Sequence, residues 1–103
     1  MIAAFSITPL GAGGSVGAVV AECVRLVRES GLPNETNAMF TNVEGDWGEV
    51  MALLKACVDK AAEAAPRVSV VVKMDVVRDD PGGRMRAKVD SVERRLAGDE
   101  RTR

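Results

Sequence analysis

The chain has 103 residues, of which 47% are hydrophobic, and a formal net charge of −1. These values predict one folded domain, and the near-neutral charge argues against nucleic acid or an anionic membrane surface as a partner. Because the chain has no histidine, it lacks the commonest general base and metal ligand, and we expect no catalytic residue, no metal and no cofactor.

The first predicted element is a β-strand over residues 2–8, in which side chains alternate between two faces. Phe5 and Ile7 share one face with Ala3. Ser6 and Thr8 lie on the other face. The apolar face is expected to pack against helices, so the two hydroxyl side chains should lie on the opposite side of the sheet.

A proline and a glycine stretch follow this strand. Pro9 is expected to end the strand, because proline cannot donate to a sheet ladder. The glycine stretch 11–14 is similar to a phosphate loop, but Val16 stands where a dinucleotide fingerprint needs its third glycine, and no lysine precedes Lys55. We favour a turn followed by Ser15 as the N-cap of a helix. Contact between the N–H groups at the helix start and a polar part of a ligand remains open.

The predicted first helix ends at Gly31, which acts as a left-handed cap before Pro33. Its apolar stripe consists of Val16, Val19, Val20, Cys23 and Val27. Residues 34–44 then predict a hairpin of two short strands that meet near Met39 and Phe40.

A second helix is predicted after the hairpin, because Asp46 and Glu49 have the spacing of a capping box. Its apolar stripe consists of Val50, Leu53, Leu54, Cys57, Val58 and Ala61. The most strand-like segment, residues 67–77, follows, and its valines alternate over both faces.

The end of the chain predicts a turn-rich loop over 78–83, a helix over about 84–97 and a flexible tail over 98–103. The helix has an apolar stripe and a charge-dense side. Its basic residues alternate with acidic ones, which indicates a solvated face; they are Arg84, Arg86, Lys88, Arg94 and Arg95.

The order βαββαβ followed by one helix predicts an α+β, ferredoxin-like sandwich, with residues 1–97 as a single domain and an extra C-terminal helix. The first strand should be central and lie beside the last. The sheet face without helices is then a mixed surface, which is either solvated or covered by another subunit, with polar pockets at the seam. We expect the second arrangement.

Two further features limit the class of protein. The longest uncharged stretch, residues 1–21, contains Pro9 and several glycines, so we expect no signal peptide, no membrane span and a cytoplasmic location. Cys23 and Cys57 show no CxxC spacing, which indicates two small buried residues rather than a zinc or redox site.

Two acidic residues follow the hairpin. Asp46 is best explained as a helix cap. For Glu44 two interpretations remain: a solvated strand end, or a carboxylate near a subunit seam that pairs with a cationic or amidine-like ligand.

Several segments resemble the YkoF-like family of small thiamine-binding proteins: "AFSITPLG", "ESGLPNETNAMFTNVEGDWGEVM", "APRVSVVVKMD" and "KVDSVERRL". The likeness covers about residues 2–96, and "TNVEGDWGEVM" is its most specific part. The resemblance implies a ferredoxin-like fold that assembles as dimers and tetramers through its sheets. It also implies binding of thiamine, or of its hydroxymethylpyrimidine part, without catalysis.

The resemblance also implies site residues. Ser6 matches the motif of the first strand, and Met39, Thr41 and Glu44 match the hairpin motif. A carboxylate and hydroxyls complement an aminopyrimidine, and Met39 or Phe40 is suited to pack on its ring. The expected ligand-binding set is Ser6, Thr8, Asn37, Met39, Phe40, Thr41 and Glu44.

The leading hypothesis is therefore a non-enzymatic protein that binds thiamine or a related pyrimidine and forms a homo-oligomer, a dimer of dimers. One alternative is a regulatory or structural module that binds a protein partner through its sheet face. The other is a small enzyme on the same fold, which the lack of an obvious base disfavours.

Overall fold

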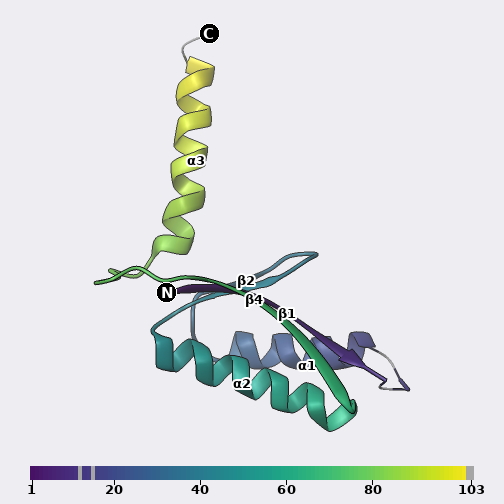
Figure 1. The fold of residues 1–103 in the computed structure, drawn as a ribbon. Helices are drawn as coiled ribbons and strands as arrows, with labels where there is room; N and C mark the ends of the chain where they lie inside the picture. Colours follow the sequence, from purple (N-terminus) through teal and green to yellow (C-terminus); the bar gives the residue numbers. More distant parts are fainter. Residues whose placement is uncertain (12, 15, 102–103) are drawn as a thin grey trace.

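The computed structural model describes residues 1–11, 13, 14 and 16–101, the last three of them by their backbone. Figure 1 shows the elements in chain order. They are β1 (Ile2–Leu10), α1 (Val16–Glu29), β2 (Asn34–Thr36), β3 (Thr41–Glu44), α2 (Trp47–Ala64), β4 (Arg67–Asp75) and α3 (Arg84–Arg101).

The strands form one antiparallel sheet in the order β2-β3-β1-β4. Helices α1 and α2 cover one face of this sheet, and α3 rises from the other side (Figure 1). The predicted α+β, ferredoxin-like arrangement with an additional C-terminal helix is confirmed.

The core lies between the sheet and the two covering helices. Its buried residues are Met1, Ala3, Phe5, Cys23, Val27, Val43, Val50, Leu53, Leu54, Cys57 and Ala61. The predicted stripe of α2 supplies much of the core, whereas of the predicted α1 stripe only Cys23 and Val27 are fully buried. Both cysteines are buried free thiols, as expected. Because side chains on β1 alternate, burying Phe5 directs Ser6 to the opposite side.

The local sequence patterns predicted several helix boundaries correctly. Asp46 caps α2: its Oδ1 accepts a bond from the Glu49 N–H at 2.8 Å, and the Glu49 Oε1 accepts one from the Asp46 N–H at 3.2 Å. Gly31 has φ +78°, the left-handed conformation predicted for a helix end. The predicted N-cap at Ser15 lies outside the described residues.

The prediction that Pro9 ends the first strand is wrong, since β1 continues to Leu10. Backbone groups alternate in direction along a strand. The Met1 carbonyl accepts a bond from Gly45 N–H at 3.1 Å, on the β3 side of β1. The N–H and C=O groups of odd-numbered β1 residues thus point toward β3. The Pro9 nitrogen points to the same side, but β3 pairs with β1 only as far as Phe5 and does not reach it. A proline there removes no ladder bond to β4.

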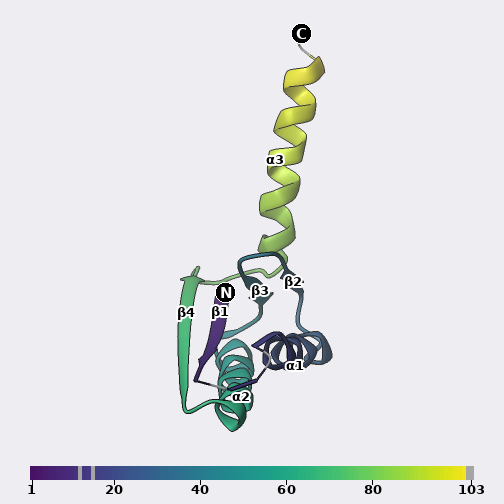
Figure 2. The same cartoon turned by 90° about the vertical axis from the view of Figure 1, so that its right-hand side faces the viewer.

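The third helix also differs from the prediction. It continues past residue 97 to Arg101, so part of the expected tail is helical. A single glycine, Gly98, lies inside it and costs about 1 kcal/mol relative to alanine, which does not end a helix by itself. Helix α3 stands away from the rest of the molecule (Figures 1 and 2), and the radius of gyration is 16.3 Å against about 13 Å for a compact chain of this size.

Within the described part of the chain, no helix is long and apolar enough to cross a membrane.

Candidate functional site

The site begins with an unequal pairing of β1. The strand pairs with β4 along its whole length, from Ile2 to Leu10, but with β3 only from Ile2 to Phe5. The second half of β1 therefore has an open edge on the β3 side. A cavity of about 250 Å³ lies against this edge. We call it the notch.

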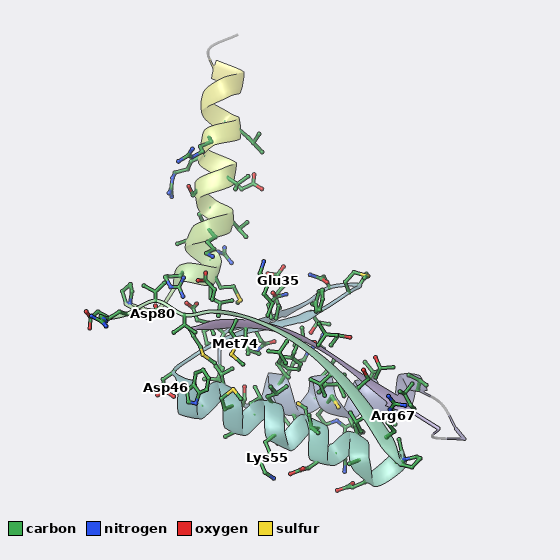
Figure 3. The ribbon with its side chains drawn as sticks, in the orientation of Figure 1. Glu35, Asp46, Lys55, Arg67, Met74 and Asp80 are labelled. Carbon is green, nitrogen blue, oxygen red and sulfur yellow. The ribbon has the colours of Figure 1, made fainter. Side chains whose placement is uncertain are left out.

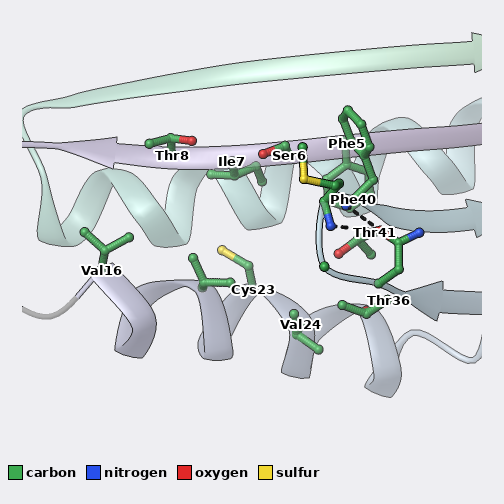
Figure 4. A pocket seen from close by; sticks show the side chains of 14 residues that line it. Phe5, Ser6, Ile7, Thr8, Val16, Cys23, Val24, Thr36, Phe40 and Thr41 are labelled. Atoms are coloured by element: carbon green, nitrogen blue, oxygen red, sulfur yellow. Dashed lines mark hydrogen bonds between the residues drawn. The ribbon is translucent and has the colours of Figure 1, made fainter.

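Three elements enclose the notch (Figure 4). Strand β1 provides one wall and α1 lies opposite, so that Ile7 points from the strand toward the helix. The β2–β3 turn closes one end. The lining residues are Phe5, Ser6, Ile7 and Thr8 of β1, Val16, Val20, Cys23 and Val24 of α1, and Thr36, Asn37, Ala38, Met39, Phe40 and Thr41 of the hairpin.

Asn37 holds the turn that closes the notch. Its Oδ1 accepts bonds from the N–H groups of Met39 and Phe40, both at 2.9 Å, and its own N–H donates to the Phe40 carbonyl at 3.0 Å. The amide oxygen is thus occupied by the turn, which makes Asn37 a positioning residue. Met39, 74% exposed, is left at the rim.

The open edge of β1 presents backbone groups to the notch. Backbone groups of odd-numbered β1 residues point to the β3 side. The N–H and C=O of Ile7 therefore face the stretch of this edge that β3 does not cover. No described residue pairs with Ile7 on that side. A strand residue in this position offers one donor and one acceptor next to each other.

The notch is mostly apolar, with a few polar groups and no charged side chain. Among the residues that the structure describes, none that lines it is Asp, Glu, Lys or Arg. Burial raises the pKa of the Cys23 thiol, and burial raises the pKa of Cys57 behind it to about 12. Cys23 therefore contributes an apolar wall and not a nucleophilic thiolate.

Six of the seven residues expected from the sequence line the notch: Ser6, Thr8, Asn37, Met39, Phe40 and Thr41. Glu44 does not. It is 4% exposed, and its carboxylate accepts bonds from the N–H groups of Arg84, at 2.9 Å, and Met85, at 3.3 Å. Glu44 thus caps the start of α3, so the interpretation as a solvated strand end is wrong, while its pairing with a ligand stays a prediction.

The foot of α3 carries a cluster of ion pairs, which we call the α3 anchor. Arg84 contacts Asp75 and Asp80, each at 3.1 Å, and Lys88 also contacts Asp75. The amino group of Met1 reaches Asp80 at 3.0 Å. Figure 3 shows Asp80 below this helix. The sequence interpretation of Arg84 as part of a solvated face missed this role, because its partners lie outside the helix.

The anchor predicts an acid-sensitive stability. Hydrogen bonds from Lys88 and then Arg84 lower the pKa of Asp75, and the Arg84 side chain, the Gly82 N–H and the terminal amino group lower the pKa of Asp80. Carboxylates with a depressed folded-state pKa stabilise the fold above their unfolded pKa, near 4, and lose this contribution as the pH falls further. Urea unfolding from neutral to acid pH should show this loss. Asp80→Asn should flatten the profile, and parallel profiles for both proteins contradict the prediction.

The sequence also missed the contribution of α1. Val16 and Val20, which belong to the predicted apolar stripe, line the notch together with Val24, which does not. Val16 and Val20 are 47% and 40% exposed. Helical spacing marks an apolar face but does not distinguish a core contact from a cavity wall.

The sheet face that carries α3 has a separate hollow of about 460 Å³. It is lined by Ile2, Ala4, Glu35, Asn37, Asn42, Lys73, Asp75, Met85, Lys88 and Val89. Of the expected ligand-binding residues, only Asn37 lines this hollow, whereas six of them line the notch. The described residues contain no group of three His, Cys, Asp or Glu side chains placed to hold a metal ion.

Comparison with known proteins gives consistent matches. A family model described as "Thiamine-binding protein" matches residues 3–93. The UPF0045 protein Mb1933 of Mycobacterium bovis is 53% identical over 97 residues, which cover 93% of this chain and 94% of that protein. The UPF0045 protein sll0230 of Synechocystis is 43% identical over 88 residues, covering 84% and 72%. The crystal structure of the hypothetical protein MJ1052 of Methanocaldococcus jannaschii has a TM-score of 0.78 at 30% identity, covering 89% of this chain and 94% of that one.

Proposed function

Because the chain belongs to the thiamine-binding protein family, we propose that it binds thiamine through the hydroxymethylpyrimidine part, in the notch, and does so without catalysis. The observation that carries this proposal is the notch itself. It joins an open strand edge, hydroxyl side chains and apolar walls in one cavity within the matched residues. Such a combination of apolar lining and a few polar groups is typical of small-molecule sites.

The charge of the lining supports the pyrimidine part as the group that enters. Thiamine joins a neutral aminopyrimidine to a cationic thiazolium. Burying a cation without a partner is costly, and no described lining residue offers a carboxylate. The neutral ring therefore occupies the notch, and the thiazolium stays toward solvent beyond the rim that Met39 forms.

The open edge supports an aminopyrimidine in particular. This ring carries an amine next to a ring nitrogen, which together form a donor and an acceptor in one plane. The N–H and C=O of Ile7 present the complementary pair. In this arrangement the ligand takes the place that a longer β3 would fill. Ser6 and Thr41 supply hydroxyls beside it, and Phe40 supplies an aromatic ring.

Filling the notch should abolish binding. We expect Val20→Trp to lower the affinity for thiamine at least about a hundredfold, or 2.7 kcal/mol, since the indole takes the volume that the ligand needs. Isothermal titration calorimetry measures this loss. Hydrogen exchange followed by nuclear magnetic resonance adds a local readout: the Ile7 amide should exchange more slowly with thiamine, whereas exchange of the Thr8 amide, directed at β4, should stay unchanged.

Ala21→Trp is the matched control, because Ala21 is exposed on the same helix and does not line the notch. It should bind thiamine as the original chain does. Absence of saturable binding by the original chain refutes the proposal. Equal loss in both variants refutes the notch as the site. Turnover of thiamine, followed by chromatography, refutes the non-catalytic part.

A further inference from the structure

The hollow on the α3 face of the sheet adjoins the notch. Asn37, which follows the last residue of β2, lines both of them. The hollow has a volume of about 460 Å³, and four of its ten lining residues carry a charge. No charged side chain lines the notch among the residues that the structure describes. A ligand seated in the notch can therefore continue past Asn37 onto a charged surface.

A row of opposed residues crosses the sheet at this hollow. Glu35 on β2 stands opposite Asn42 on β3, which stands opposite Ala4 on β1. Ala4 in turn stands opposite Lys73 on β4. The row faces the α3 side, because the neighbours of Ala4 along β1 are buried against the helices. Adjacent strands lie about 4.8 Å apart, so the acidic and basic ends of the row are about 14 Å apart, with a small side chain between them.

The two ends of the row differ in charge. Glu35 is exposed, and no described residue forms an ion pair with it; Figure 3 shows it on the α3 side of the sheet. At the other end, Lys73 likewise has no ion-pair partner among the described residues. Asp75 beside it already contacts Arg84 and Lys88. The β2 end is therefore negative and the β4 end positive.

The order of these charges specifies the order of groups in a ligand. From the notch outward, the lining is neutral, then negative at Glu35, then positive at Lys73. A complementary molecule is neutral, then cationic, then anionic. The pyrimidine and thiazolium rings of thiamine supply the first two groups. A phosphate on the hydroxyethyl arm of the thiazolium supplies the third, with a charge of about −1.5 to −2 at neutral pH.

We propose that the hollow recognises the phosphate of a thiamine phosphate ester, with Lys73 as the phosphate contact and Glu35 beside the thiazolium. This inference rests on the proposed binding of the pyrimidine in the notch. Ile7 and Ala4 are three residues apart on β1, or about 10 Å, a length comparable to two linked rings and a short arm. The flexible four-carbon stem of Lys73 lets its ammonium approach the phosphate as a point charge.

Calorimetry with two ligands tests this assignment. We expect thiamine monophosphate to bind the original chain at least about tenfold more tightly than thiamine at low salt, and high salt should reduce this preference. Lys73→Gln should remove most of the preference and leave the affinity for thiamine unchanged, because thiamine carries no phosphate. Glu35→Gln should weaken both ligands by a similar factor, since both contain the cation.

Lys55→Gln is the matched control. Lys55 is an exposed lysine on α2, on the opposite side of the sheet from the hollow (Figure 3), and it does not line the hollow. This variant removes the same charge from the chain and should keep the full preference for the monophosphate. A similar loss in Lys55→Gln and Lys73→Gln would make the preference an effect of net charge and would overturn the site.

Phosphorus nuclear magnetic resonance gives a second readout at the group itself. The second pKa of a free phosphate ester is about 6, and a nearby ammonium should lower this pKa in the bound ester. Lys73→Gln should return it toward the value of the free ester.

The outcomes separate this inference from the proposed function. Saturable binding of thiamine with no preference for the monophosphate overturns the phosphate site and leaves pyrimidine binding in the notch intact. A preference that Lys73→Gln retains in full overturns the role of Lys73. Absence of binding for both ligands overturns the proposed function, and the phosphate site with it.

Discussion

Replacing Phe5 with alanine is expected to lower the free energy of unfolding by about 3–5 kcal/mol. Phe5 is 4% exposed and belongs to the buried cluster between the sheet and the two covering helices. Its ring also forms part of the notch, so the truncation opens a void that connects to the cavity. Urea denaturation at neutral pH measures the change.

Phe40→Ala is the matched control, because Phe40 carries the same ring at the mouth of the notch and is only partly buried. We expect a much smaller loss of stability there, together with weaker thiamine binding. If Phe5→Ala and Phe40→Ala cost the same free energy of unfolding, the assignment of Phe5 to the core is wrong.

Replacing Glu44 with alanine is expected to release α3 and to leave thiamine binding intact. The substitution removes the acceptor of two N–H groups at the start of the helix, those of Arg84 and Met85. Leaving part-buried donors unpaired costs about 1–3 kcal/mol. Hydrogen exchange should show faster exchange at these two amides, and urea unfolding should show the loss of stability.

Glu35→Ala provides the comparison, since Glu35 is an exposed carboxylate on the neighbouring strand β2. Glu35→Ala should change neither the exchange of the Arg84 and Met85 amides nor the stability to urea. Loss of thiamine binding by Glu44→Ala while the Arg84 amide stays protected would restore Glu44 as a ligand residue. Calorimetry and exchange on the same sample separate these outcomes.

The parts of the fold that depend on neighbours in sequence were predictable. The capping box at Asp46, the left-handed glycine after α1 and the hairpin all follow from a few adjacent residues, and the structure contains each of them. The alternation along β1 likewise identified Phe5 as a core residue.

The features that were missed depend on distant partners. Whether Pro9 ends a strand is decided by which neighbour its nitrogen faces, and that requires the register of three strands. Glu44 finds its partner 40 residues later along the chain, at Arg84, and no local pattern marks that contact. Of the six expected residues that line the notch, Ser6, Met39 and Thr41 were identified by resemblance to a family motif, which carries spatial information that periodicity lacks.

Strand β3 starts only at Thr41, opposite Phe5, so the length of the β2–β3 hairpin determines the size of the notch. Two more residues in each arm of the hairpin would extend the β1–β3 ladder from Phe5 to Ile7 and close the cavity, because hydrogen-bonded pairs in an antiparallel ladder recur every second residue. A shorter hairpin would widen it. Neither change alters Phe5 or Val43 in the core. Insertions and deletions in the β2–β3 turn can therefore change which molecule fits the notch, while the core that stabilises the domain stays the same.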